Sequence, residues 1–173
     1  AVDPQVNDAA DTSREIRLLW AASREEPEAM SDGQPSDPFP MHTQRLTLRF
    51  VREGDVETLT AYRNDPEVNA LQDWDLPYPA ERARKLVARH EGLTDVAPGG
   101  HNQIAIELDG ELVGDVYVGI HDEGGVADIG FTLIPSAQGR GIAHEAVSAL
   151  IEHLIERHGI HRIVAELSKD NLA

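Results

Sequence analysis

Apolar and polar positions alternate with a period of two at residues 46–50, and three further stretches rich in apolar residues also read as strands. The predicted strands span residues 46–50, 103–108, 112–120 and 127–134. The dipeptide Asp109-Gly110 separates the second stretch from the third and is typical of a tight hairpin turn. The pattern therefore predicts one strand followed, after a gap, by three consecutive antiparallel strands.

Helical periodicity is clearest at residues 142–158, where apolar residues recur at i, i+3, i+4, i+7 and i+8. Gly159 supplies the predicted C-terminal stop of this helix. Two shorter helices are predicted nearer the N-terminus, one over residues 55–63 with Asp55 as its cap and one over residues 79–93. The chain thus alternates strands and helices, and one more strand is predicted at residues 162–167.

Residues 1–44 differ from the rest and are expected to form an acidic extension ahead of one domain at residues 45–173. They hold nine acidic and three basic residues, with prolines at Pro4, Pro27, Pro35, Pro38 and Pro40. Thr12 and Glu15 have the spacing of a capping box, so one helix is expected there, ending near Pro27.

Composition narrows the function classes. The 173 residues contain no cysteine, which excludes disulfides and thiolate metal sites, and the net charge is −16. This charge argues against a nucleic-acid partner, because no basic face forms easily. The negative charge is compatible with a cationic substrate, or it simply keeps the protein soluble. No apolar run is long enough for a membrane span and no signal pattern opens the chain, so a cytoplasmic protein with no membrane partner is expected.

Residues 129–146 combine a strand, a proline stop, a glycine loop and the first turn of the long helix. Gly139 and Gly141 carry no side chain, so the backbone there can approach a ligand closely. The helix start offers free N–H groups and the positive end of its dipole, and Arg140 adds a positive charge. Together these features predict a site for a phosphate or pyrophosphate.

Two common phosphate-binding motifs do not fit this loop. The dinucleotide fingerprint needs a third glycine where His144 stands, and the Walker loop needs a Gly-Lys-Ser/Thr ending that is absent. The stretch instead resembles motif A of the GNAT acetyltransferases, Gln/Arg-x-x-Gly-x-Gly/Ala, which Gln138-x-x-Gly141-x-Ala143 matches. Residues 63–68 resemble the branch of that family that includes the ribosomal-protein alanine N-acetyltransferases.

The resemblance implies an α/β GNAT fold, in which helices flank a mixed, mostly antiparallel sheet and acetyl-CoA lies in the cleft between the fourth and fifth strands. Loop amides would hold the pyrophosphate, and amides of the preceding strand would serve the thioester carbonyl. The implied cofactor-binding residues are Phe131, Thr132, Leu133, Ile134, Gln138, Gly139, Arg140, Gly141, Ile142, Ala143 and Asn171. In the family a short helix and two strands follow, so the domain is expected to be incomplete at Ala173.

Acetyl transfer to an amine needs a base, and Asp128 is the first candidate. It is the only acid within residues 127–134, and this branch usually has Glu or Asp before the Ile-Gly step. The alternative is that Asp128 faces water or bonds to the neighbouring loop. Asp115 and His121 are weaker candidates, and the helix dipole explains Glu145 without catalysis. The resemblance places the general acid in the segment that is missing here.

Trp74 and Tyr78 lie in a loop on the side where this branch of the family binds its acceptor. They are expected to line the substrate pocket or, alternatively, to cap the core. His153, His158 and His161 are spaced at i, i+5 and i+8, which does not put three rings on one helical face. Each is therefore interpreted as a separate surface histidine, and no metal site is predicted.

These features predict an acetyl-CoA-dependent N-acetyltransferase whose acceptor attacks directly in a ternary complex. The expected acceptors are a protein N-terminus, a small-molecule amine or an aminoglycoside-like antibiotic. The alternative is a non-catalytic acyl-CoA-binding or regulatory module of the same fold. The family is often dimeric, so a homodimer is a further expectation that no pattern in this sequence tests.

Overall fold

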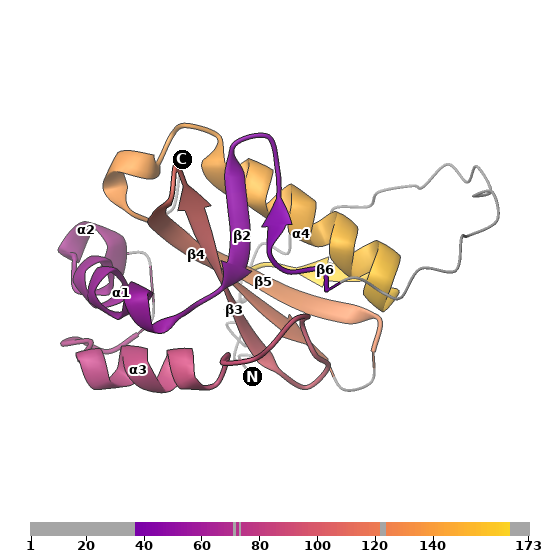
Figure 1. Cartoon of the computed structure of the whole chain (residues 1–173), viewed down its shortest axis with the longest axis horizontal. Helices are drawn as coiled ribbons and strands as arrows, with labels where there is room; N and C mark the ends of the chain where they lie inside the picture. The colour runs from indigo at the N-terminus through magenta and orange to yellow at the C-terminus, as the bar shows by residue number, and fades with distance from the viewer. Residues whose placement is uncertain (1–36, 71, 73, 122–123, 167–173) are drawn as a thin grey trace, which may run out of the picture.

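A six-stranded sheet forms the centre of the computed structural model, which describes residues 37–70, 72, 74–121 and 124–166 (Figure 1). The strands are β1 Met41–His42, β2 Leu46–Phe50, β3 His101–Leu108, β4 Glu111–Ile120, β5 Val126–Leu133 and β6 Arg162–Val164. The α-helices are α1 Val56–Arg63, α2 Pro66–Asn69, α3 Ala80–Ala88 and α4 Ile142–His158. The helix predicted within residues 1–44 lies outside the described residues.

The strands follow one another in chain order across the sheet, β1 to β6. Neighbours from β1 to β5 are antiparallel, whereas β5 and β6 are parallel because α4 connects them. Asp109 and Gly110 turn the β3–β4 hairpin with φ angles of 53° and 86°. The predicted mixed, mostly antiparallel sheet is thus confirmed.

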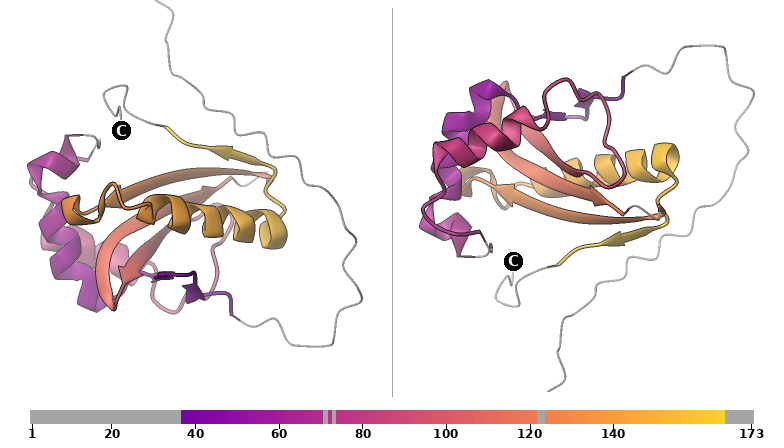
Figure 2. Two further views of the ribbon diagram at one scale, coloured as in Figure 1. Left: turned by 90° about the horizontal axis from the view of Figure 1, so that it is seen from above. Right: turned by 90° about the horizontal axis from the view of Figure 1, so that it is seen from below.

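Helices cover both faces of the sheet (Figure 2). Helix α4 packs on one face through its predicted apolar stripe, against alternate residues of the central strands. Helices α1 and α3 pack on the opposite face in a second apolar cluster. The largest fully buried apolar side chains are Leu48, Leu59, Ile104, Ile106, Ile142, Leu150, Leu154, Ile160, Val116 and Val118. No helix in the described part of the chain is long and apolar enough to cross a membrane.

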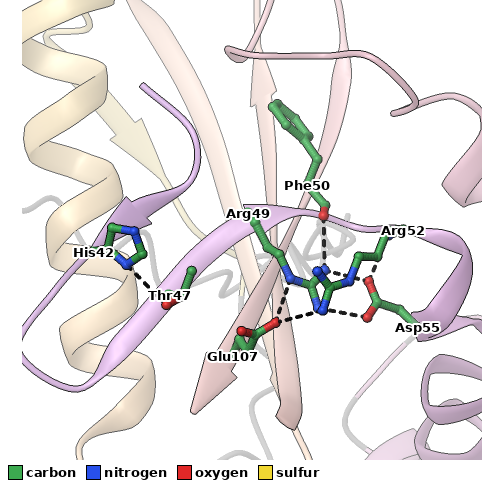
Figure 3. A network of polar contacts seen from close by, with 7 residues as sticks. All are labelled: His42, Thr47, Arg49, Phe50, Arg52, Asp55 and Glu107. Atoms are coloured by element: carbon green, nitrogen blue, oxygen red, sulfur yellow. Dashed lines mark hydrogen bonds and ion pairs between the residues drawn. The ribbon is translucent and has the colours of Figure 1, made fainter. Parts of the chain in front are cut away.

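Arg49 joins β2 to β3 and to the start of α1 (Figure 3). Its guanidinium donates to both carboxylate oxygens of Asp55, at 2.7 and 2.9 Å, and to Glu107 at 2.7 Å. Asp55 also accepts from the Arg52 amide at 2.7 Å. Asp55 therefore stands at the N-cap position of α1, as predicted, but its side chain makes no cap bond to that helix. The prediction of a capping side chain is wrong because Arg49 and the preceding turn occupy the carboxylate.

Several boundaries differ from those expected from the sequence, and β6 ends at Val164 rather than at residue 167. Strand β1 pairs with β2, and Phe39 is buried in the core, so packed residues precede the expected start at residue 45. Helix α3 ends at Ala88 rather than at residue 93. His90 explains the earlier end, because its Nδ1 lies 2.7 Å from the Leu86 carbonyl and its Nε2 accepts from the Gln103 amide at 2.8 Å. The buried ring thereby joins the end of this helix to β3.

Candidate active site

Strands β5 and β6 pair only at their beginnings. Val126, Ala127 and Asp128 face Arg162, Ile163 and Val164 in parallel register. After Asp128, β5 continues to Leu133 beside β4, but no described strand pairs with its other edge. Figure 2 shows β6 running away from β5 at this point. The parting of the two strands leaves backbone groups of β5 unpaired within the described residues, at the place predicted for acetyl-CoA.

Two hydrogen bonds at the ends of the β4–β5 ladder show which backbone groups face this open edge. The His121 amide donates to Val126 and the Ile134 amide donates to Val113, each at 3.0 Å. Alternation along an antiparallel ladder then points the Thr132 amide toward β4 and the amides of Phe131 and Leu133 toward the open edge. Phe131, Thr132 and Leu133 were predicted to donate their backbone amides to the thioester carbonyl. The prediction is wrong for Thr132, because its amide points toward β4 and away from the open edge.

The glycine loop follows this edge directly. Gln138 donates its side-chain amide to the Leu133 carbonyl at 3.1 Å, which folds the loop back onto β5. Gly139 and Gly141 have φ angles of 68° and 73°, a conformation that disfavours other residues. A Cβ added at Gly139 would meet nothing within 4 Å. The loop backbone is thus exposed and open to a ligand, as the motif predicted.

The loop leads into α4 at Ile142, whose side chain is fully buried and can offer a ligand only its backbone. Ala143 is half-buried, and Ile134 packs at the edge of both apolar clusters. Arg140 is exposed and donates to the Ser136 carbonyl at 3.4 Å, so its charge stays beside the loop. Asn171, the last of the predicted cofactor residues, lies outside the described residues.

Arg45 is a residue of this region that the sequence analysis missed. It lies in the turn between β1 and β2, and its Nη1 donates to the Arg140 carbonyl at 3.1 Å. Its Nε donates to Glu145 in the first turn of α4 at 2.7 Å, and a Cβ added at Gly141 would lie 3.7 Å from its Nη2. A charged pair one hundred positions apart leaves no local signal in the sequence.

A pocket of about 430 Å³ opens beside Asp128, on the sheet face opposite α4. Its polar side chains come from His101, Tyr117, His121 and Asp128. His101 pairs with Gly119 across β3 and β4, and Gly119 pairs with Asp128 across β4 and β5, so these groups share one face. The absence of a side chain at Gly119 leaves room for the Tyr117 ring, whose hydroxyl would lie 2.4 Å from an added Cβ.

Asp128 is hydrogen-bonded within this pocket. Its Oδ2 lies 2.9 Å from His121 Nε2, and both side chains remain about half exposed. The Tyr117 hydroxyl lies 2.8 Å from His101 Nδ1, and burial together with the Asp128 charge raises the pKa of Tyr117. The pocket therefore brings a carboxylate, a phenol and two imidazoles to the point where β5 and β6 part.

Asp115, a weaker candidate for the base, is only 1% exposed and forms an ion pair with Arg63. Burial is the largest single effect on Arg63 and lowers its pKa, but the charge and hydrogen bond of Asp115, together with Tyr62 and Tyr78, raise the pKa of the guanidinium overall. A carboxylate held in this way is closed to a substrate. Asp115 thus joins α1 to β4.

The two predicted substrate-binding aromatics also surround Arg63. Tyr78 is 2% exposed, and its hydroxyl accepts from Arg63 at 3.3 Å. Trp74 is half-buried, and its indole N–H donates to the Arg63 carbonyl at 2.9 Å. The Arg63 guanidinium lies 5.1 Å from the centroid of each ring. The expectation that Tyr78 lines an open pocket is wrong, because its ring belongs to the core, whereas Trp74 keeps an exposed part.

Residues 45–173 match the family model described as the acetyltransferase (GNAT) domain. The chain is 29% identical over 132 residues to the uncharacterized N-acetyltransferase p20 of Bacillus licheniformis, covering 76% of this chain and 74% of that protein.

Two solved structures are similar over most of the described domain. One is RimL, a ribosomal L7/L12 α-N-protein acetyltransferase in complex with coenzyme A, with a TM-score of 0.63, 27% identity and coverage of 75% and 74% of the two chains. The other, from Salmonella typhimurium, modifies the N-terminal serine of ribosomal protein L7/L12 and has a TM-score of 0.63, 26% identity and coverage of 75% of each chain.

Proposed function

Because the chain belongs to the GNAT acetyltransferase family, we propose that it transfers the acetyl group of acetyl-CoA to a primary amine, with Asp128 as the base. One observation carries this proposal. The pocket that holds Asp128 lies where β5 and β6 part, and the same open edge of β5 leads to the glycine loop. In this proposal the nucleotide site and the acceptor site share the edge of one strand.

The residues of the loop fit acetyl-CoA, the co-substrate of the family. Gly139 and Gly141 leave the backbone accessible, and α4 begins immediately afterwards with free N–H groups. The positive end of the α4 dipole and the exposed Arg140 favour the charge of a pyrophosphate. The amides of Phe131 and Leu133 on the open edge are the available donors for the thioester carbonyl. When bound, acetyl-CoA supplies an activated acetyl group as a thioester.

The acceptor side follows from the pocket. An amine that enters beside Asp128 loses a proton to the carboxylate, directly or through one water molecule, and its nitrogen forms the new bond to the acetyl carbon. The bond from that carbon to sulfur breaks, and the departing thiolate takes up the proton that the nitrogen loses on forming the amide, so the thiol of coenzyme A is the second product. His121 positions the carboxylate through its bond to Oδ2. Tyr117 and His101 line the pocket through which the amine reaches Asp128. Holding the amine beside the thioester supplies much of the rate acceleration.

We expect the acceptor to be a positively charged amine in its resting form. The net charge of −16 draws cations toward the molecule, and Asp128 is half exposed to an incoming one. The two solved enzymes described above act on the N-terminus of ribosomal protein L7/L12. A peptide with a free N-terminal amine and a small polyamine are therefore the two acceptors to test first.

The test is calorimetric titration of the full chain with acetyl-CoA, compared with Gly141→Glu. A carboxylate at this position repels a pyrophosphate, so binding should be lost. Gly110→Glu is the matched control, because Gly110 also has a positive φ and open surroundings but lies in the β3–β4 turn. No binding by the folded wild-type protein, or equal binding by Gly141→Glu, would contradict the proposed nucleotide site.

Thiol release with the amine panel then tests catalysis. Release of coenzyme A that depends on an added amine supports the acetyltransferase. Tight binding of acetyl-CoA with no release for any amine would instead favour the non-catalytic binding module.

A further inference from the structure

Two histidines of α4 meet an aspartate from the loop before β3. Asp95 Oδ1 lies 2.8 Å from His153 Nε2 and 3.2 Å from His158 Nε2. One ligand atom from each of the three residues lies within 4.8 Å of the other two. We propose that this cluster binds a divalent transition-metal ion, with Zn²⁺ as the best-fitting occupant. The proposal does not depend on the acetyltransferase activity.

This arrangement corrects the interpretation of these residues as separate surface histidines. The spacing of His153, His158 and His161 does not put the three rings on one helical face. The structure instead adds Asp95, which is 58 and 63 positions away from the two histidines that it joins. His161 is exposed and lies after the end of α4, outside the cluster.

The distances fit a tetrahedral ion. Zinc binds imidazole nitrogen and carboxylate oxygen at about 2.0–2.2 Å, which separates neighbouring tetrahedral ligand atoms by roughly 3.3 Å. The separation between Asp95 Oδ1 and His158 Nε2 is within about 0.1 Å of this value, and that between Asp95 Oδ1 and His153 Nε2 is about 0.5 Å shorter. Two nitrogen ligands select zinc, cobalt or nickel over calcium or magnesium, which prefer oxygen. Three protein ligands leave the fourth position to water.

The surrounding residues hold the ligands in place. The side chains of His153, His158 and Asp95 are 8%, 16% and 24% exposed. Phe39 packs against the His153 ring, edge to face, with centroids 5.5 Å apart. Arg157 donates to Asp95 Oδ2 at 2.9 Å and the Val96 amide donates to Oδ1 at 2.8 Å, and these two bonds orient the carboxylate with Oδ1 beside the histidines. The positive charge of Arg157 repels a bound cation, and the negative charge of the Asp95 carboxylate, which lies between the two, offsets this repulsion.

The position of the cluster indicates a structural role. Phe39 donates its amide to Thr94 at 3.4 Å, so the chain before β1, the α3–β3 loop and α4 all meet here. His153 lies eleven residues after Ile142, or about 16 Å along the helix at 1.5 Å per residue. A bound ion would tie these three segments together. We expect it to stabilise the fold without changing acetyl-CoA binding at the other end of α4.

The first experiment uses tag-free, full-length protein after treatment with a chelator. Titration with Zn²⁺ should show one ion per chain, and saturating Zn²⁺ should raise the melting temperature by a few degrees. Titration with Co²⁺ should give the visible absorption bands of a four-coordinate site with nitrogen and oxygen ligands. Absence of saturable Zn²⁺ binding, or of these bands at saturating Co²⁺, would overturn the proposal.

Variants assign the ligands. His153→Gln and His158→Gln should each weaken Zn²⁺ binding tenfold or more, whereas His161→Gln, the matched control, should bind as the wild type does. Circular dichroism before the titration selects folded protein, and His158→Gln is the safer variant because its side chain is the more exposed of the two. Unchanged affinity in both folded variants would place any bound zinc elsewhere and refute the site.

Discussion

Arg45 and Glu145 form an ion pair that joins the turn before β2 to the first turn of α4, with 2.7 Å between Arg45 Nε and Glu145 Oε2. Glu145 Oε1 also accepts from the Arg45 amide at 2.8 Å and from the Thr43 hydroxyl at 2.5 Å. Because Arg45 holds the Arg140 carbonyl as well, the glycine loop is fixed from a distant part of the chain. The α4 dipole is therefore not the only reason for an acidic residue at position 145.

Removing the Arg45 side chain should loosen the loop and weaken acetyl-CoA binding. We expect Arg45→Ala to raise the KM for acetyl-CoA by roughly three- to tenfold, the scale of one or two lost hydrogen bonds to charged groups after solvent screening. The kcat should change little, because the acceptor pocket is untouched. Steady-state kinetics measure both constants. Arg84→Ala is the control, since Arg84 is an exposed cation near Glu53, and an equal rise in KM there would contradict the assignment.

The same pair predicts a dependence of stability on pH. The Thr43 hydrogen bond, which is the largest effect, and Arg45 lower the pKa of Glu145 despite partial burial. A lowered pKa in the folded state stabilises the protein above the unfolded value of about 4.3, and the stabilisation is lost as the pH falls through the folded value. The melting temperature of wild type should exceed that of Glu145→Gln by a constant amount from pH 8 to about pH 5. This difference should shrink below about pH 4, and a difference that stays constant to pH 3 would argue against it.

Asp128→Asn tests the base. The amide keeps the shape of the side chain but cannot accept the proton, so kcat should fall by about 10²- to 10⁴-fold. Acetyl-CoA affinity by calorimetry should stay within about twofold of wild type, because the loop is unchanged. His121→Ala should give a smaller loss, as expected for a positioning residue. Activity of Asp128→Asn near that of the wild type would remove Asp128 from the mechanism.

Asp115→Asn should strongly reduce the stability of the fold. It leaves the buried Arg63 guanidinium without its counter-charge, which typically costs about 3–5 kcal/mol of unfolding free energy. Asp109→Asn is a suitable control, since Asp109 is exposed and sits at a turn that asparagine tolerates. Urea denaturation measures both variants. A loss below about 1 kcal/mol for Asp115→Asn would show that the pair contributes little.

The sequence predicted those features that residues close in the chain decide. The period-two run and the apolar stretches gave the strands, and the apolar stripe gave α4 from Ile142 to His158 with Gly159 at its end. The glycine loop was equally local, because the free backbone and the helix start are properties of adjacent residues. The error at the end of α3 arose because His90 continues the apolar face in sequence while its ring is bound to β3 in space.

The tertiary structure alone decided which distant side chains meet. Arg45 reaches Glu145, Asp95 reaches His153, and Tyr78 turns into the core beside Arg63 rather than toward a pocket. Periodicity reports whether a residue faces the core or the solvent, but not which partner stands opposite. That partner depends on strand register and on how the helices pack across the sheet. The chain pattern thus determined the elements and the glycine loop, and packing determined the pocket, the buried ion pair and the histidine cluster.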